Sequence, residues 1–114
     1  MPLSVTVVIR ENPYKTHRAV EALRIALGLS TGPNPLTVVL LDEAPVVLTD
    51  DIDNLVDVEL LEKHTPVLKE LAIPFIVPES THSRFRLNPE FKVREASLDD
   101  IARLIARSDR VLAF

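Results

Sequence analysis

The stretch LTVVLLDEAPVVL, residues 36–48, decides which fold this chain adopts. Residues 36–41 form a continuous run of apolar and β-branched side chains without polar alternation. Such a run is typical of a central strand in a parallel sheet, because helices cover both faces of that strand. Asp42 and Glu43 end the run, and Pro45 has no N–H to continue a sheet ladder. The stretch therefore predicts a buried strand followed by two carboxylates.

Strand-like and helix-like segments alternate on both sides of this stretch. The alternation predicts a mainly parallel sheet of four or five strands, with residues 36–41 in its centre and helices on both faces. This fold class is a three-layer α/β sandwich. A chain of 114 residues is long enough to bury a core but too short for two domains, so we expect residues 1–114 to form a single domain. The other expected strands are residues 3–9, 73–77, 91–94 at an edge, and 111–114.

Apolar residues spaced three and four apart predict amphipathic helices between the strands. Asn12 is the expected N-cap of the first helix, with Pro13 at its first helical position. Thr65 and Pro66 are expected to begin a separate short helix or to mark a kink. Residues 78–89 show no periodicity and predict a polar loop. The expected helices are residues 14–29, 56–63, 67–71, and a last one capped by Ser97 with Ile101, Leu104 and Ile105 buried.

Composition excludes several classes of function. A net charge of -4 and 4% aromatic residues argue against a nucleic-acid partner, which would favour basic and stacking surfaces. The absence of cysteine excludes disulfides, thiolate metal sites and thiol chemistry carried by this chain. No stretch approaches the roughly 20 apolar residues of a membrane span, and residues 1–4 lack the basic region of a signal peptide. We therefore expect a cytoplasmic protein with no membrane partner.

The loops that follow the strands of a doubly wound sheet meet at one edge, where ligands bind. His82 in one of these loops is a candidate general acid or base that a carboxylate would orient. One interpretation is an arrangement of Ser80, His82 and Asp42, but no nucleophile-elbow sequence is present, and the alternative is a solvated loop. We assign no catalytic residue. We predict a ligand-binding site formed by Asn12, Asp42, Glu43, Glu79, Ser80 and His82.

Motifs for metals and cofactors are absent from the sequence, so we predict neither. Aspartates at positions 50, 51 and 53 lack the spacing of an EF-hand, and an acidic helix start explains them better. There is no HExxH, GxGxxG or P-loop, and only two glycines are available for a close approach to a pyrophosphate. Arg84 and Arg86, with Ser83, would hold an anion, or else they are ordinary surface charge.

Four segments of the chain form a familiar series. They contain PYKT and EAL at residues 13–16 and 21–23, VLLDEAPV at 39–46, IPFIVPES at 73–80 and SDRVLAF at 108–114. In this order they resemble the DsrE/DsrF-like family of sulfur-relay proteins, most closely its DsrF (TusC) branch. The resemblance spans nearly the whole chain.

The resemblance implies a small α/β subunit of a trimer or a larger hetero-oligomer. Active subunits of that family carry persulfide sulfur on a cysteine just after the third strand. Pro78 stands about where that cysteine would fall, and no cysteine occurs elsewhere. The resemblance therefore implies a non-catalytic subunit that acts by assembly in intracellular sulfur transfer. Its partners would be copies of itself, as a trimer or higher homo-oligomer, or cysteine-bearing DsrE-like subunits.

Apolar residues outside the obvious helix stripes also favour assembly, because one small core does not need them. These residues are Val46, Val47, Leu48, Leu55 and Leu60.

Two other functions stay open. The first is a small-molecule or anion-binding α/β domain that uses Asp42, Glu43 and residues 79–82. The second is a small hydrolase or transferase that uses His82.

Overall fold

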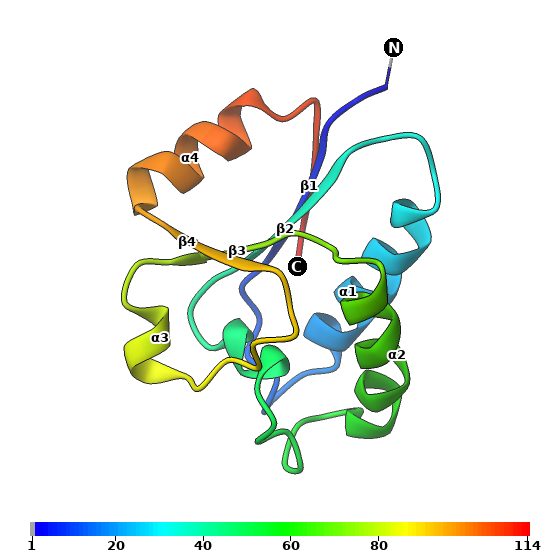
Figure 1. Ribbon diagram of the computed structural model, residues 1–114, viewed down its shortest axis with the longest axis vertical. Coiled ribbons are helices and arrows are strands. Elements are labelled where there is room, and N and C mark those ends of the chain that lie inside the picture. Colours follow the sequence, from blue (N-terminus) through cyan, green and yellow to red (C-terminus); the bar gives the residue numbers. More distant parts are fainter. Residues whose placement is uncertain (1) are drawn as a thin grey trace.

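The computed structural model describes residues 2–114 and contains a five-stranded, all-parallel sheet with helices on both faces (Figure 1). The strand order β4-β3-β2-β1-β5 puts β2 in the middle, so the predicted central strand and fold class are confirmed. The strands are β1 (Val5–Ile9), β2 (Leu36–Leu40), β3 (Phe75–Pro78), β4 (Val93–Ala96) and β5 (Arg110–Ala113). The helices are α1 (Arg18–Ser30), the 3-10 helix η1 (Ala44–Leu48), α2 (Val58–Glu70), α3 (Thr81–Arg84) and α4 (Leu98–Arg107).

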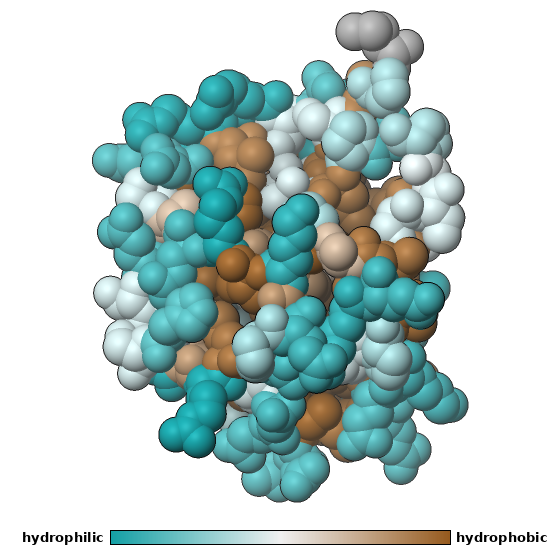
Figure 2. Space-filling view, viewed as in Figure 1, coloured by the Kyte–Doolittle hydropathy of each residue, from teal (hydrophilic) through white to brown (hydrophobic). Residues whose placement is uncertain are grey.

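Two cores lie on opposite faces of the sheet. Val38 and Leu40 of β2 join the larger core, which α1 and α2 cover, whereas Val39 points into the smaller core beneath α4. All three side chains are fully buried, which explains why this part of the strand is apolar on both faces. On the face seen in Figure 2, most surface residues are hydrophilic, with hydrophobic residues visible between them. Within residues 2–114, no helix is long and apolar enough to cross a membrane.

The segment after β2 folds back into the larger core as η1. Its residues Val46, Val47 and Leu48 are buried there, and so is Leu55 farther along the chain. These four residues therefore give no support to assembly, and that part of the sequence argument was wrong. Only Leu60 of the set is exposed, at 44%.

The edge strand β4 begins two residues later than the sequence predicted. Phe91 is not a strand residue but packs edge-on against Phe75, with ring centroids 6.0 Å apart, and is buried in the larger core. The chain joins the sheet just after this anchor, where the Phe75 amide donates to the Lys92 carbonyl. The shift brings Glu95 into the strand.

Two expected helix boundaries were also wrong. Asn12 does not cap α1, because its side chain accepts from the Tyr14 amide and so closes a separate turn before α1 begins at Arg18. The helix α2 runs through Pro66 without a break. Buried Leu61 and Leu68, on either side of Pro66, hold α2 in the larger core, and this packing outweighs the lost backbone hydrogen bond.

The C-terminus of α2 has a left-handed residue that is not glycine. Ala72 has φ 51°, its amide donates to the Lys69 carbonyl, and the Ile73 amide donates to the Leu68 carbonyl. These two bonds form a Schellman motif, in which the left-handed position is normally glycine. Alanine there carries a steric cost between Cβ and the backbone.

We expect Ala72→Gly to raise the free energy of unfolding by about 0.5–1.5 kcal/mol, because relief of the left-handed strain exceeds the added entropy of the unfolded chain. Urea unfolding would measure the change. Ala102→Gly in the exposed middle of α4 is the matched control and should destabilise by about 0.5–1 kcal/mol. An equal loss in both variants would contradict the strain at Ala72.

Candidate functional site

The turns after β2 and β3 lie at the carboxyl edge of the sheet, as the predicted site requires. Asp42 follows β2 with φ 56°, and Ser80 follows β3 with φ 75°. Both are left-handed backbone conformations that side chains other than glycine rarely adopt. Strain of this kind is concentrated at functional sites, because packing has to hold it in place.

Charged side chains connect the turn after β2 to α3. The Arg84 guanidinium donates to the Glu43 carboxylate at 2.7 Å and to the Asp42 carbonyl at 3.3 Å. Arg10 lies 3.8 Å from the Asp42 carboxylate, and the side chains of both are about two-thirds exposed or more. Exposed pairs of this kind add little stability. The effect of the Arg84 contacts is positional, since they hold α3 beside the β2 turn.

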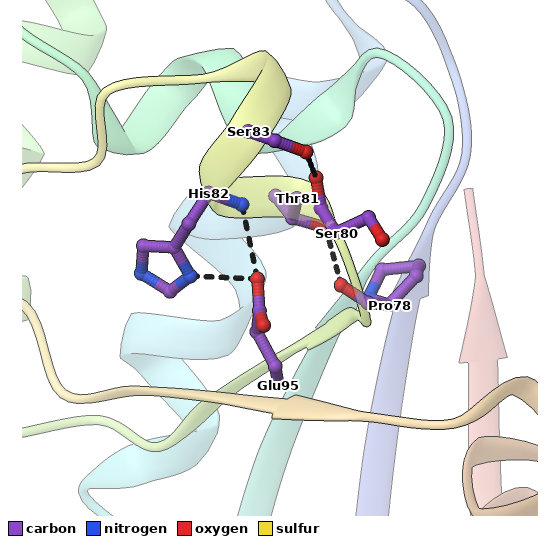
Figure 3. A network of polar contacts seen from close by, with 6 residues as sticks. All are labelled: Pro78, Ser80, Thr81, His82, Ser83 and Glu95. Atoms are coloured by element: carbon purple, nitrogen blue, oxygen red, sulfur yellow. Dashed lines mark hydrogen bonds and ion pairs between the residues drawn. The ribbon is translucent and has the colours of Figure 1, made fainter.

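His82 pairs with a carboxylate that the sequence did not point to. Its backbone N–H donates to Glu95 Oε2 at 3.0 Å, and its ring Nδ1 lies 2.7 Å from the same oxygen (Figure 3). Glu95 therefore orients the imidazole, which remains 57% exposed. Knowing that Glu95 belongs to β4, beside β3, would have been enough to find this pair.

The arrangement of Ser80, His82 and Asp42 is not formed. Figure 3 shows the Ser80 hydroxyl pointing away from the His82 ring, and the ring nitrogen is paired with Glu95 instead of Asp42. The serine contacts of this turn are local: Ser83 Oγ donates to the Ser80 carbonyl at 2.6 Å. In this turn Ser80 is not paired with His82, so the geometry does not support the hydrolase interpretation built on these residues.

The predicted site residues share one edge of the sheet without sharing one cavity. Asp42 lines a hollow with Arg10, whereas Glu79 and Ser80 line a different one. Asn12 is engaged in its own turn. Within residues 2–114, no three side chains gather in a way that could hold a metal ion.

A larger cavity beside α3 was missed from the sequence. It has a volume of about 540 Å³, and Tyr14, Phe85, Asp51, Arg84 and Arg86 are among its lining residues. The sequence signal was the Arg-Phe-Arg run at 84–86, which was read only for its charge. Tyr14 comes from the turn before α1, far from this run in sequence, so only the folded chain brings the two together.

The hydrogen bonds from His82 hold the pKa of Glu95 below its ordinary value of 4.5, with the bond from the backbone N–H as the largest cause. Because the folded carboxylate binds its proton less tightly, the unfolded state takes up more protons as the pH falls. The stability that this pair contributes is thus present above about pH 4.5 and lost as the pH falls through the lowered pKa.

We expect Glu95→Gln to flatten the dependence of stability on pH between about pH 5 and pH 3 and to lower stability at neutral pH. Denaturant midpoints across this range would measure both effects. Glu79→Gln is the control, because that exposed carboxylate accepts no hydrogen bond within residues 2–114 and should leave the wild-type slope unchanged. Parallel curves for wild type and Glu95→Gln would contradict the expectation.

A model of the DsrE/DsrF-like family matches residues 3–114, nearly the whole chain. The chain belongs to the DsrE/DsrF-like family. Among solved structures, the crystal structure of ychN protein from E. coli is similar, with a TM-score of 0.77, 18% sequence identity and 100% of each chain covered. That likeness shows a shared fold. No match was found among curated proteins.

In this DsrE/DsrF-like chain, Pro78 ends β3 and pairs in register with Ala96 of β4. Its carbonyl accepts from the Thr81 hydroxyl at 2.6 Å, which fixes the turn into α3. The proline is half-buried and lines an open hollow of about 390 Å³ with Glu79 and Ser80. This position at the end of the third strand is therefore accessible from solvent, and the residue there has no sulfur.

Proposed function

We propose that this chain is a cysteine-free, non-catalytic subunit of DsrE/DsrF-like assemblies, acting by association in sulfur transfer in the cytoplasm. The supporting observation is the family match over residues 3–114 combined with Pro78 at the end of β3 and no cysteine in the sequence. Persulfide transfer needs a thiolate as nucleophile and carrier. The chain would act as one domain, and a cysteine-bearing subunit would supply the sulfur atom.

An exposed apolar stripe on α2 supports association. Leu60 and Val67 of α2 and the C-cap residue Leu71 are 44%, 41% and 49% exposed, and their spacing of seven and four residues puts them on one side of the helix. Lys63 and Glu70, both exposed, carry opposite charges along the same helix. Burying this stripe against a second copy would remove apolar area from water and match charges of opposite sign.

The experiment is a mass measurement in solution. At about ten to one hundred micromolar, a range in which weak oligomers form, light scattering should give a trimer or larger. Val67→Glu would put a charge into the stripe and should give a monomer, whereas Ala102→Glu on the exposed face of α4 should keep the wild-type mass.

The same measurement is then repeated with a cysteine-bearing DsrE-like subunit from the same genome. A mixed complex would support the proposal even if the pure chain were a monomer. A monomer in both measurements would overturn association. Sulfur transfer by the pure wild-type chain would overturn its non-catalytic role.

A further inference from the structure

The cavity beside α3 has side chains of both charges on its walls and an apolar surface between them. Its volume of about 540 Å³ lies within the range of small-molecule sites, roughly 300–1,000 Å³. We propose that this cavity binds a free α-amino acid with an apolar side chain. Asp51 would bind the ammonium group, Arg86 would bind the carboxylate, and Tyr14 and Phe85 would contact the side chain.

Asp51 supplies an available anion at a fixed place. The Thr49 hydroxyl donates to the Val46 carbonyl at 2.8 Å and accepts from the Asp51 amide at 3.2 Å. Thr49 is buried, so this segment is anchored to the core. The neighbouring Asp50 carboxylate is engaged by the Asn88 amide at 2.9 Å, whereas the Asp51 carboxylate has no partner within residues 2–114.

Like Asp50 and Asp51, the two arginines of the cavity differ in whether their charged group is already paired. Arg84 is held by Glu43 at 2.7 Å, and its guanidinium lies 4.9 Å from the centre of the Phe85 ring. Arg86 forms no ion pair or hydrogen bond within residues 2–114 and is exposed. A guanidinium presents two parallel N–H groups to a carboxylate, so Arg86 is the group suited to the acid end of the ligand.

A ligand with one charge fits this cavity less well than a zwitterion. A simple anion near Arg86 would also face the carboxylates of Asp50 and Asp51, and a simple amine would leave Arg86 without a counter-ion. Tyr14 is 43% exposed, and its ring, the ring of Phe85 and the side chain of buried Val46 offer an apolar contact surface. An amino acid with an apolar side chain satisfies both charges and this surface together.

Isothermal titration calorimetry of the intact chain with L-phenylalanine tests the proposal. We expect binding that weakens at least tenfold for 3-phenylpropionate, which lacks the amine, and for phenethylamine, which lacks the carboxylate. Asp51→Asn and Arg86→Gln should each weaken the binding of L-phenylalanine at least tenfold. Asp99→Asn and Arg110→Gln, at exposed positions outside the cavity, are the matched controls and should bind as wild type does.

Amide shifts in nuclear magnetic resonance spectra locate the ligand independently of the variants. Shifts on addition of L-phenylalanine should be largest at Asp51, Phe85 and Arg86. The proposal is overturned by no heat and no shifts at millimolar L-phenylalanine, by shifts confined to other parts of the chain, or by equal affinity for the two singly charged analogues. These outcomes do not depend on sulfur transfer or on assembly.

Discussion

Leu40→Ala is expected to lower the free energy of unfolding by about 3–4 kcal/mol. Leu40 ends the middle strand, is fully buried, and contributes to the larger core that α1 and α2 cover. The cost combines the lost transfer of the deleted atoms from water with the cavity left among neighbours that are fixed by the sheet and cannot close it. For a domain of this size, the loss is a large share of the total stability.

Urea unfolding followed by circular dichroism would measure this change. Leu98→Ala is the matched control, because Leu98 is 68% exposed and its truncation should change stability by no more than about 0.5 kcal/mol. A loss below about 1 kcal/mol in Leu40→Ala would show that the site collapses around the smaller side chain, against the expectation from a central strand.

The sheet could be predicted because its signal is local. Residues 36–41 are apolar or β-branched on both faces, and the structure covers both faces of β2 with helices. The N-cap role of Ser97 was likewise predicted from the residues that follow it in the sequence. Its hydroxyl accepts from the Asp100 amide at 3.1 Å at the start of α4. Features whose cause lies within a few residues are visible in a single sequence.

Features that depend on distant contacts were missed. The start of β4 is set by the packing of Phe91 on Phe75, and continuity of α2 through Pro66 is set by burial of its neighbours. In the same way, α3 has four residues and is too short to show a helical period. Tertiary packing decided the first two cases against the local preference, and the third helix was missed because it is short.

In the candidate site, the error in the bounds of β4 also hid the partner of His82. With the edge strand placed at 91–94, Glu95 fell outside the sheet, and Asp42 was the carboxylate considered for His82. In the structure β4 begins at Val93, which places Glu95 beside Val77 and within reach of His82. Because side chains alternate between faces, the register of a strand decides which pairs of residues meet.

Pro78→Cys is expected to convert a chain without transferable sulfur into one that carries a persulfide. The position ends β3, lies on an open hollow and is half-buried, so a cysteine thiolate there could attack a polysulfide donor. The thiolate would form an S–S bond with a sulfane sulfur, and the shortened polysulfide would leave. The proline ring is not part of either core, so the fold should persist.

Mass spectrometry after incubation with polysulfide would measure the added sulfur, with iodoacetamide to count free thiols. Ala102→Cys, on the exposed face of α4, is the matched control and reports the reactivity of an ordinary surface thiol. Persulfide on Pro78→Cys well above this control would show that the turn after β3 retains the geometry of a sulfur-relay site. Equal loading of the two variants would show that the cysteine at position 78 reacts as an ordinary surface thiol. The turn after β3 would then not be a former sulfur-relay site. Any sulfur loading of the cysteine-free wild type would contradict the requirement for a thiolate.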